Sequence, residues 1–351
     1  MRFSPERIQE FAAALCEAVG FCNKDAEEIA KILVKNDMRG ISSHGINNLL
    51  NYLNQAAKGA INTKASYKTV KDAGAIALID AECGMGLLSG KTAMELAIEK
   101  AKLYGIGAVG VKNTSHSGAL GYYASMCSEQ KMLGIAMGTS NPIMTMVGGK
   151  GRMIGNNPLA FAAPSPEAPI LFDIAMSIMS GGKLRVLSAQ GKELPCGVML
   201  DKNGSSTTKL EEYLQGGALI PMGNHKGFGL ALMIEILCSV LSGAGIGSQN
   251  HDWVEESEYI NRFGQFFIAI PADIFIPYEE FESNMAFLRK DMRQNFSECV
   301  FPGELENTAA DRSKKEGIEL EISLLKRLET YCKQTDSVDI FDSFLRSGNR
   351  D

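Results

Sequence analysis

Hydrophobic residues in the first sixty positions recur at the spacing of amphipathic helices. One apolar face runs over residues 8–19, behind Ser4 as a predicted cap and Pro5 at the first helical position. A second face covers residues 26–34, behind Asn23 as a predicted cap, and a third covers residues 46–57. The pattern predicts a helical N-terminal segment over residues 1–60.

The pattern changes in the middle of the chain, where short apolar runs alternate with helical stretches. Two runs around Asp72-Ala-Gly74 indicate a hairpin, and later runs alternate with helices ending near residues 101 and 130. This alternation is typical of an α/β sheet domain. The expected strands cover residues 66–70, 75–80, 106–111, 134–138 and 170–174.

The last third contains the most apolar helical pattern of the chain, over residues 229–240. A strand is predicted over 265–270, a helix around 280–292 and a closing helix whose apolar face includes residues 318–328. Residues beyond Thr335 are expected to fray, because their pattern is weak and chain ends are often poorly ordered.

Composition and charge narrow the classes of function. The chain has 351 residues, 45% hydrophobic, and a net charge of −6 without an extended basic run, which argues against a nucleic-acid partner. The apolar block at 229–240 is too short to span a bilayer and contains Glu235, so no membrane association is expected. Eight cysteines without a C-x-x-C pair, and only four histidines, predict a cytoplasmic protein with no metal site.

Common nucleotide-binding motifs do not explain this sequence. Residues 105–110 match G-x-G-x-x-G, but the match ends a predicted helix and enters a strand, which is the reverse of a dinucleotide fingerprint. The G-x-x-x-x-G-K-[ST] motif does not occur.

A single histidine follows the strand predicted at residues 106–111. His116 stands after a polar bend and before Ser117-Gly118, which lead into the next predicted helix. A histidine at a strand end can face a cleft and exchange a proton near neutral pH. We therefore predict His116 as a proton-transfer group.

A second histidine, His44, lies in the turn Asp37-Met-Arg-Gly-Ile-Ser-Ser-His-Gly45. Ser42 or Ser43 is a plausible helix cap, and this would put His44 at the positive end of a helix, where its neutral form is favoured. When this segment is taken alone, a surface histidine within a cap is the favoured explanation of the two.

Two lysines lie beside glycines and could contact a bound anion. Lys183 follows small residues that allow close approach of a ligand, although a flexible linker fits the same pattern. Lys226 and Gly227 precede the apolar helix, where a cofactor phosphate could bind. A surface lysine beside a packing glycine is the alternative, but a second glycine, Gly229, favours the ligand. Either lysine could also form a Schiff base with pyridoxal phosphate.

Taken together, these motifs resemble the type-2 malate/L-lactate dehydrogenase family, which also includes ureidoglycolate and sulfolactate dehydrogenases and diketogulonate reductases. The matching pieces occur in the family's order from residue 39 to residue 304. They are Arg39-Gly-Ile-Ser-Ser-His-Gly45, His116-Ser-Gly, Gly155-Asn-Asn-Pro-Leu-Ala, Asp173-Ile-Ala, Gly182-Lys183, Leu194-Pro195, Pro221-Met-Gly, Lys226-Gly-Phe-Gly and Pro302-Gly-Glu304.

The resemblance implies a non-Rossmann NAD(P)-binding fold with a mixed central sheet and helical segments at both ends. It implies a homodimer, with a cofactor-binding lobe over about 116–254 and a substrate and dimerisation lobe from 61–115 and 255–351. The cofactor is NAD or NADP, with NAD favoured. By similarity, its binding residues are Ser140, Asp173, Ile174, Ala175, Lys183, Lys226, Gly227, Pro302, Gly303 and Glu304.

The same resemblance implies an oxidoreductase that moves a hydride between the nicotinamide and a 2-hydroxy acid such as malate, lactate or ureidoglycolate. The proton-transfer role falls on His116 in ureidoglycolate-type members and on the equivalent of His44 in diketogulonate-type members. Histidine suits this exchange because its pKa lies at roughly 6.5. Substrate contacts are predicted for Ser43, Asn48, Tyr52 and Arg262.

The chain departs from the family where the substrate is expected. Asn48 occupies a position that usually holds an arginine, and Asn261 aligns with a second arginine, although Arg262 is adjacent. Arginine can grip a carboxylate with two parallel hydrogen bonds, whereas asparagine cannot. The alternative function is therefore a non-catalytic dinucleotide-binding protein that has lost substrate capture.

Overall fold

A seven-stranded mixed sheet organises the chain, in the order β2-β3-β4-β11-β5-β6-β7. The computed structural model describes residues 1–146, 148–189, 191–296 and 298–346. β3 and β4 pair in parallel and the other neighbours are antiparallel, as the expected mixed sheet requires. The strands are β2 (Lys68–Ala73), β3 (Ile76–Gly84), β4 (Gly107–Thr114), β5 (Met132–Gly138), β6 (Leu159–Ala163), β7 (Ile170–Ile174) and β11 (Phe263–Pro271).

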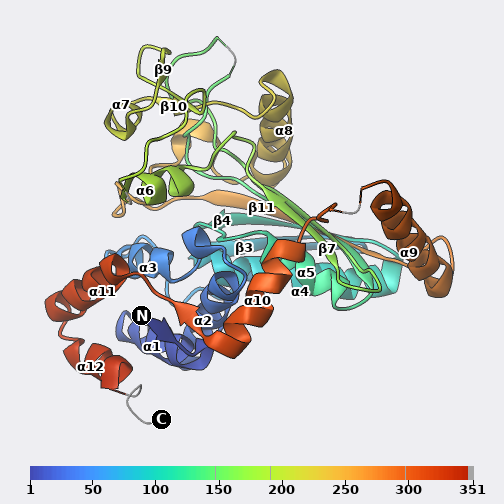
Figure 1. The fold of residues 1–351 in the computed structure, drawn as a ribbon, viewed down its shortest axis with the longest axis horizontal. Helices are drawn as coiled ribbons and strands as arrows, with labels where there is room; N and C mark the ends of the chain where they lie inside the picture. Colours follow the sequence, from blue (N-terminus) through green and yellow to red (C-terminus); the bar gives the residue numbers. More distant parts are fainter. Residues whose placement is uncertain (147, 190, 297, 347–351) are drawn as a thin grey trace.

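Helices cover one face of this sheet in two layers (Figure 1). α4 and α5 pack directly on the strands, and the N-terminal helices pack beyond them together with the last two helices. The elements of this side are α1 (Pro5–Ala18), α2 (Asn23–Met38), the 3₁₀ turns Ser42–His44 and Ile46–Asn48, α3 (Leu49–Ala57), α4 (Gly86–Tyr104), α5 (Gly121–Ser128), α10 (Glu304–Glu316), α11 (Ile322–Gln334) and α12 (Val338–Arg346).

A smaller subdomain covers the other face and has its own apolar cluster. The apolar helix predicted over 229–240 forms α8, which continues as a π-helix that packs on β4 and β11. The elements of this side are α6 (Gly181–Ala189), β8 (Met199–Leu200), β9 (Ser206–Thr207), α7 (Leu210–Leu214), β10 (Ala218–Leu219), α8 (His225–Glu235), the π-helix Ile236–Val240 and the 3₁₀ turn Gly247–Gln249. The helix predicted around 280–292 is α9 (Tyr278–Asn295), which projects beyond one edge of the sheet.

The predicted elements recur at slightly shifted bounds. The expected helix after His116 begins at Gly121, and the closing helix begins at Ile322 because residues 318–319 form β12 (Ile318–Glu319). Ser4 caps α1 as predicted, accepting a hydrogen bond from the Arg7 amide, whereas Asn23 is the first residue of α2 and does not cap it.

The G-x-G-x-x-G match is a packing feature, as its position in the sequence predicts. Gly105 ends α4 in the left-handed conformation, and the other two glycines lie in β4. A Cβ on Gly107 would lie 1.9 Å from the carbonyl oxygen of Ala97, so this glycine lets α4 pack tightly on β4.

Among the described helices, none is long and apolar enough to cross a membrane.

The division into two lobes stays a prediction. The seven-stranded sheet contains strands from the predicted cofactor-binding range, 116–254, and from the predicted substrate ranges, 61–115 and 255–351. The two predicted lobes therefore share one sheet.

The expectation that the chain frays beyond Thr335 is wrong for residues 338–346, which form α12. Phe341 and Phe344 are buried, and the Phe344 ring stacks on Phe11 and Phe3 at centroid distances of 4.3 and 4.6 Å. β12 also pairs with β1 (Arg2–Phe3), so the first strand and the elements from β12 to α12 are held in one cluster. The local sequence pattern does not predict this pairing, because β1 and β12 are more than 300 residues apart in the chain.

We predict that Phe344→Ala lowers the free energy of unfolding by about 3–5 kcal/mol, because it leaves a cavity between three aromatic rings. Urea unfolding followed by circular dichroism measures the change. Leu345→Ala is the matched control on the same helix, since Leu345 is 40% exposed and should change stability little. Equal losses in the two variants would show that α12 is not held by Phe344.

Candidate active site

The direction of the strands brings the predicted site residues to one edge of the sheet. Since β4 and β5 both pair antiparallel with β11, and β5 and β7 both with β6, these three strands run in the same direction. His116 follows β4, Ser140 follows β5, and Asp173 and Ile174 end β7. Their carboxyl ends therefore open onto a common space.

That space is a cleft of about 700 Å³ between the helical layer and the smaller subdomain. Its size is within the range of about 300–1,000 Å³ that is typical of ligand pockets. The predicted site residues that line it are Ser43, His44, Asn48, His116, Ser140, Asp173, Ile174, Ala175 and Lys183.

His116 is held by contacts from three parts of the chain. The Tyr52 hydroxyl of α3 lies 2.8 Å from His116 Nδ1, and the Gly118 amide donates to the same nitrogen over 3.2 Å. The ring of Trp253 stacks on the imidazole at a centroid distance of 4.1 Å and an interplanar angle of 12°. Tyr52 lies behind His116, outside the cleft lining, and reaches the site through this hydrogen bond.

His44 faces the same cleft, with its ring centroid 5.9 Å from that of His116. The predicted cap is wrong. Residues 42–44 form a 3₁₀ turn without a side-chain cap, and α3 begins only at Leu49, so His44 is not at the start of a helix. The Ser43 hydroxyl lies 2.9 Å from His44 Nδ1.

Loss of solvation keeps both histidines neutral. It lowers the pKa of His44 to about 4. It also lowers the pKa of His116, together with the charge of His44, to about 3. The neutral form that a helix start was expected to favour is therefore produced by desolvation.

A buried carboxyl group, Asp37, fixes the turn that carries His44. Asp37 Oδ2 accepts a hydrogen bond of 2.8 Å from the Ile46 amide. A Cβ on Gly45 would lie 2.0 Å from Asp37 Oδ1, which explains why a glycine follows His44. The Asn36 side chain also donates to the His44 carbonyl over 3.0 Å.

On the predicted cofactor side, Asp173 and Ser140 are tied to neighbouring loops. Asp173 Oδ2 accepts a 2.7 Å hydrogen bond from the Gly121 amide at the start of α5. Burial raises the pKa of Asp173 to about 6. The Ser140 hydroxyl donates to Asn156 over 3.0 Å. Among the described side chains, that of Lys183 has no hydrogen bond or ion pair, so it is free to meet an anion.

Asn48 is engaged within the protein. Its amide nitrogen donates to the Ser43 carbonyl over 2.8 Å, and its oxygen accepts from Asn51 over 3.3 Å. Asn261 is buried outside the cleft lining, and its oxygen accepts from the His251 amide over 2.7 Å. Asn48 thus supports the Ser43–His44 turn.

Other predicted residues lie outside the cleft lining. Lys226 is exposed at the start of α8, and Gly227 packs so closely that a Cβ would lie 2.4 Å from the Met222 carbonyl oxygen. Arg262 is exposed as well. Pro302 lies one hydrogen bond away, since its carbonyl accepts from the cleft residue Leu171 over 3.0 Å. The roles predicted for these residues stay predictions.

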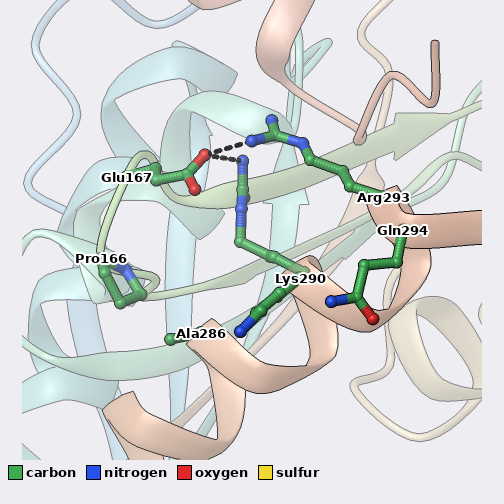
Figure 2. Close-up of a pocket in the computed structure, with 7 residues that line it drawn as sticks. Pro166, Glu167, Ala286, Lys290, Arg293 and Gln294 are labelled. Atoms are coloured by element: carbon green, nitrogen blue, oxygen red, sulfur yellow. Dashed lines mark hydrogen bonds and ion pairs between the residues drawn. The ribbon is translucent and has the colours of Figure 1, made fainter. Parts of the chain in front are cut away.

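Glu304 is engaged in ion pairs beside a separate pocket of about 470 Å³ at α9 (Figure 2). Arg289 and Arg293 both contact its carboxylate, at 2.5 and 2.6 Å. Figure 2 shows Arg293 directed at Glu167. Arg289 contacts the same carboxylate at 3.3 Å. Gly303, which precedes Glu304, has the left-handed conformation. The network holds α9 and the start of α10 against the β6–β7 turn.

Several lining residues were not predicted as site residues. Trp253 and Asp252 come from the loop after α8, Arg39 from the end of α2, Arg185 from α6 and Glu306 from α10. A single tryptophan within a polar segment was an available signal for Trp253. The others are polar residues whose place depends on how distant elements pack, which local patterns do not report.

Comparison with known proteins agrees with this architecture. The sequence profile of the malate/L-lactate dehydrogenase family matches residues 3–329. The chain belongs to this family. It is therefore a dehydrogenase, and the motifs that suggested the family are distributed around the cleft and its supporting loops.

Named relatives cover most of the chain. Malate dehydrogenase of Pyrococcus horikoshii is 35% identical, over 95% of each chain. Ureidoglycolate dehydrogenase (NAD(+)) of Escherichia coli K12 is 30% identical, over 91% of this chain and 93% of the relative. The solved sulfolactate dehydrogenase from Methanocaldococcus jannaschii superposes with a TM-score of 0.87 at 33% identity, covering 96% of this chain and 98% of the other.

Asp37 makes the stability of the histidine turn depend on pH. Burial raises its pKa to about 7. A carboxyl whose folded pKa is raised contributes stability that is lost as pH rises from its unfolded pKa, about 3.9, through its folded pKa. We therefore predict that Asp37→Asn gains melting temperature relative to the wild type as pH rises from 4 to 7, with a constant difference above about pH 8.

Thermal melts of both proteins across this range measure the difference. Asp342→Asn, at a half-exposed position of α12, is the control for the same type of substitution outside this turn. A flat difference for Asp37→Asn over the full range would contradict the raised pKa.

Proposed function

We propose that the protein is an NAD-dependent dehydrogenase that interconverts a 2-hydroxy acid and its 2-oxo acid. The observation that carries the proposal is the pair of neutral, cleft-facing histidines at 5.9 Å, in a chain of the malate/L-lactate dehydrogenase family. Relatives named malate, sulfolactate and ureidoglycolate dehydrogenases support a hydroxy acid as substrate. The class includes malate, lactate and ureidoglycolate-like compounds.

The cofactor side of the cleft fits a dinucleotide. Gly182 approaches the turn that carries His44, and a Cβ there would lie 3.7 Å from the Ser43 Cβ, so a larger side chain would fill the space between α6 and that turn. Ser140, Asp173–Ala175 and Lys183 would hold the cofactor, with hydroxyl, carboxyl and ammonium groups around it. Relatives named for NAD(+) favour NAD over NADP. When bound, NAD accepts the hydride of the hydroxy acid.

The protein's own groups orient the substrate and manage its proton. Both histidines line the cleft, so a bound hydroxy acid would direct its reacting hydroxyl towards them, and Ser43 is a neighbouring hydrogen-bonding group. Trp253 and the 3₁₀ turn line this end of the cleft, and burial there desolvates both histidines, which keeps them in the neutral form. A histidine that takes or gives the hydroxyl proton contributes roughly 10²–10⁴-fold to the rate.

The experiment that tests this function uses Trp253 as a probe, because the chain contains one tryptophan and it lines the cleft. NADH and NADPH are titrated against tryptophan fluorescence, and a panel of 2-oxo acids is then assayed with the cofactor that binds more tightly. We expect NADH to bind and at least one 2-oxo acid to be reduced. Binding without reduction of any panel member would favour the non-catalytic alternative, and no binding would overturn the proposal.

His116→Ala is expected to lower kcat by roughly two to four orders of magnitude. The loss has a chemical origin, so NADH affinity and melting temperature should change little. Steady-state kinetics with the best substrate measure the effect. His225→Ala is the control, because His225 is exposed at the start of α8, outside the cleft lining. An unchanged kcat in His116→Ala would remove this residue from the mechanism.

We also propose that the protein is a cytoplasmic homodimer, with the outer face of α8 and its π-helix as an interface. Met233, Ile236 and Val240 are 40%, 47% and 53% exposed and share one helical face. Exposed apolar faces of this kind mark association surfaces.

Ile236→Lys is expected to give monomers in light scattering after gel filtration, whereas Leu103→Lys, at an exposed site on α4, should stay dimeric. Wild-type monomers would overturn the proposal.

A further inference from the structure

The two hydrogen bonds at His116 Nδ1 determine which ring nitrogen carries the proton. A backbone amide can only donate, so the 3.2 Å contact from Gly118 requires a free lone pair on Nδ1. The Tyr52 hydroxyl, 2.8 Å from the same atom, is compatible with this arrangement when it also donates, so that the two donors share the one lone pair of Nδ1. A neutral imidazole whose Nδ1 accepts has its hydrogen on Nε2.

We propose that Gly118 and Tyr52 hold His116 as the neutral Nε2–H tautomer, so that His116 donates a hydrogen bond to the reacting oxygen while His44 exchanges the proton. This inference rests on the proposed function and assigns the two histidines different tasks. His116 would act as an electrophilic hydrogen-bond donor that neither gains nor loses a proton.

Trp253 is the positioning residue in this arrangement. Its ring stacks on His116 at 4.1 Å and on Tyr52 at 5.5 Å, so one indole contacts both members of the hydrogen bond. Rotation of the imidazole about its Cβ–Cγ bond would break the bonds to Nδ1 and force the ring past the indole. The stack therefore keeps Nε2 as the nitrogen available to a ligand.

His44 has no comparable constraint. Its Nδ1 partner is the Ser43 hydroxyl, at 2.9 Å, and a hydroxyl can either donate or accept. His44 can therefore take a proton without facing a fixed donor. Its pKa, lowered to about 4, is also higher than that of His116, which is lowered to about 3 because His116 feels the charge of His44 as well.

The oxidation step then balances as follows. The substrate's hydroxyl proton moves to His44, the hydride from the same carbon goes to the oxidised cofactor, and the new carbonyl oxygen accepts a hydrogen bond from His116 Nε2–H. In the reverse direction His44 returns the proton. Two cationic rings with centroids 5.9 Å apart would repel each other in a desolvated cleft, so a single proton shared through His44 is the favourable arrangement.

The first test needs no substrate and reads the tautomer directly. Long-range proton–nitrogen correlation spectra are recorded at pH 7 on protein labelled with ¹⁵N-histidine, which has four histidines to resolve. The His116 signals are assigned by their loss in His116→Gln. We expect an unprotonated Nδ1 and a protonated Nε2. The opposite pattern would overturn the proposal whether or not the protein proves to be a dehydrogenase.

Two variants separate the supports in the same spectra. Tyr52→Phe keeps the Gly118 donor and should retain the Nε2–H pattern. Trp253→Leu should give a mixture of the two tautomers, because the ring loses its orienting contact. Loss of the pattern in Tyr52→Phe would show that the amide does not set the tautomer, and an unchanged pattern in Trp253→Leu would remove the positioning role of Trp253.

The second test uses steady-state kinetics to distinguish the hydrogen-bond donor, His116, from the proton acceptor, His44. Glutamine can present an N–H near the position of Nε2, so His116→Gln should recover kcat about 10-fold or more over His116→Ala, the equivalent of one hydrogen bond. It should also keep the fall in kcat/KM for hydroxy acid oxidation as pH drops towards about 4, which tracks His44.

His44→Gln is expected to lose roughly 10²–10⁴-fold in kcat and to lose that acidic limb. Circular dichroism at each pH confirms that the variants are folded. If His116→Gln is as inactive as His116→Ala, or if the limb survives in His44→Gln, the division of roles is wrong. A wild-type enzyme without turnover on the panel would overturn the proposed function alone, because the spectra still report the tautomer.

Discussion

The direction of the strands in the central sheet is the constraint on which the rest of the structure depends. β4, β5 and β7 run the same way because each pairs antiparallel with a strand that lies between them in the sheet order. Their carboxyl ends deliver His116, Ser140 and Asp173 to one edge. Apolar clusters cover both faces of the sheet, and the cleft lies at the edge where these three strands end.

The helical layer then completes the site from a distance in sequence. Asp37 holds the turn of His44, α3 brings Tyr52 to His116, and the pairing of β1 with β12 joins this layer to the C-terminal helices. The aromatic cluster around Phe344 is therefore connected, through the packing of α1 and α2, to the element that carries one of the two histidines.

Electrostatics in the cleft follow from desolvation more than from paired charges. The pKa of each histidine is lowered and the pKa values of Asp37 and Asp173 are raised, all with burial as the leading cause. Such a site favours neutral hydrogen-bonding groups, and a charged ligand there must bring or find a partner. Lys183 offers such a charge, whereas Asn48 has both ends of its amide engaged within the protein.

The sequence by itself determined the elements and the family. The spacing of apolar residues and the positions of glycines located the sheet strands of the middle region and the apolar helix at 229–240. The order of short motifs identified a member of the malate/L-lactate dehydrogenase family, with His44 and His116 as candidate acid–base groups. These are local properties, set by side-chain spacing and by residues with special backbone freedom.

Tertiary structure decided which other side chains these residues contact. Four features depend on segments that are far apart in the chain. They are the stacking of Trp253 on His116, the ordering of α12, the absence of a helix cap at Ser42 or Ser43, and the position of Lys226 outside the cleft lining. A local pattern records which residues face a core, but which core they face, and which nitrogen of a histidine is left free, is set by packing between distant elements.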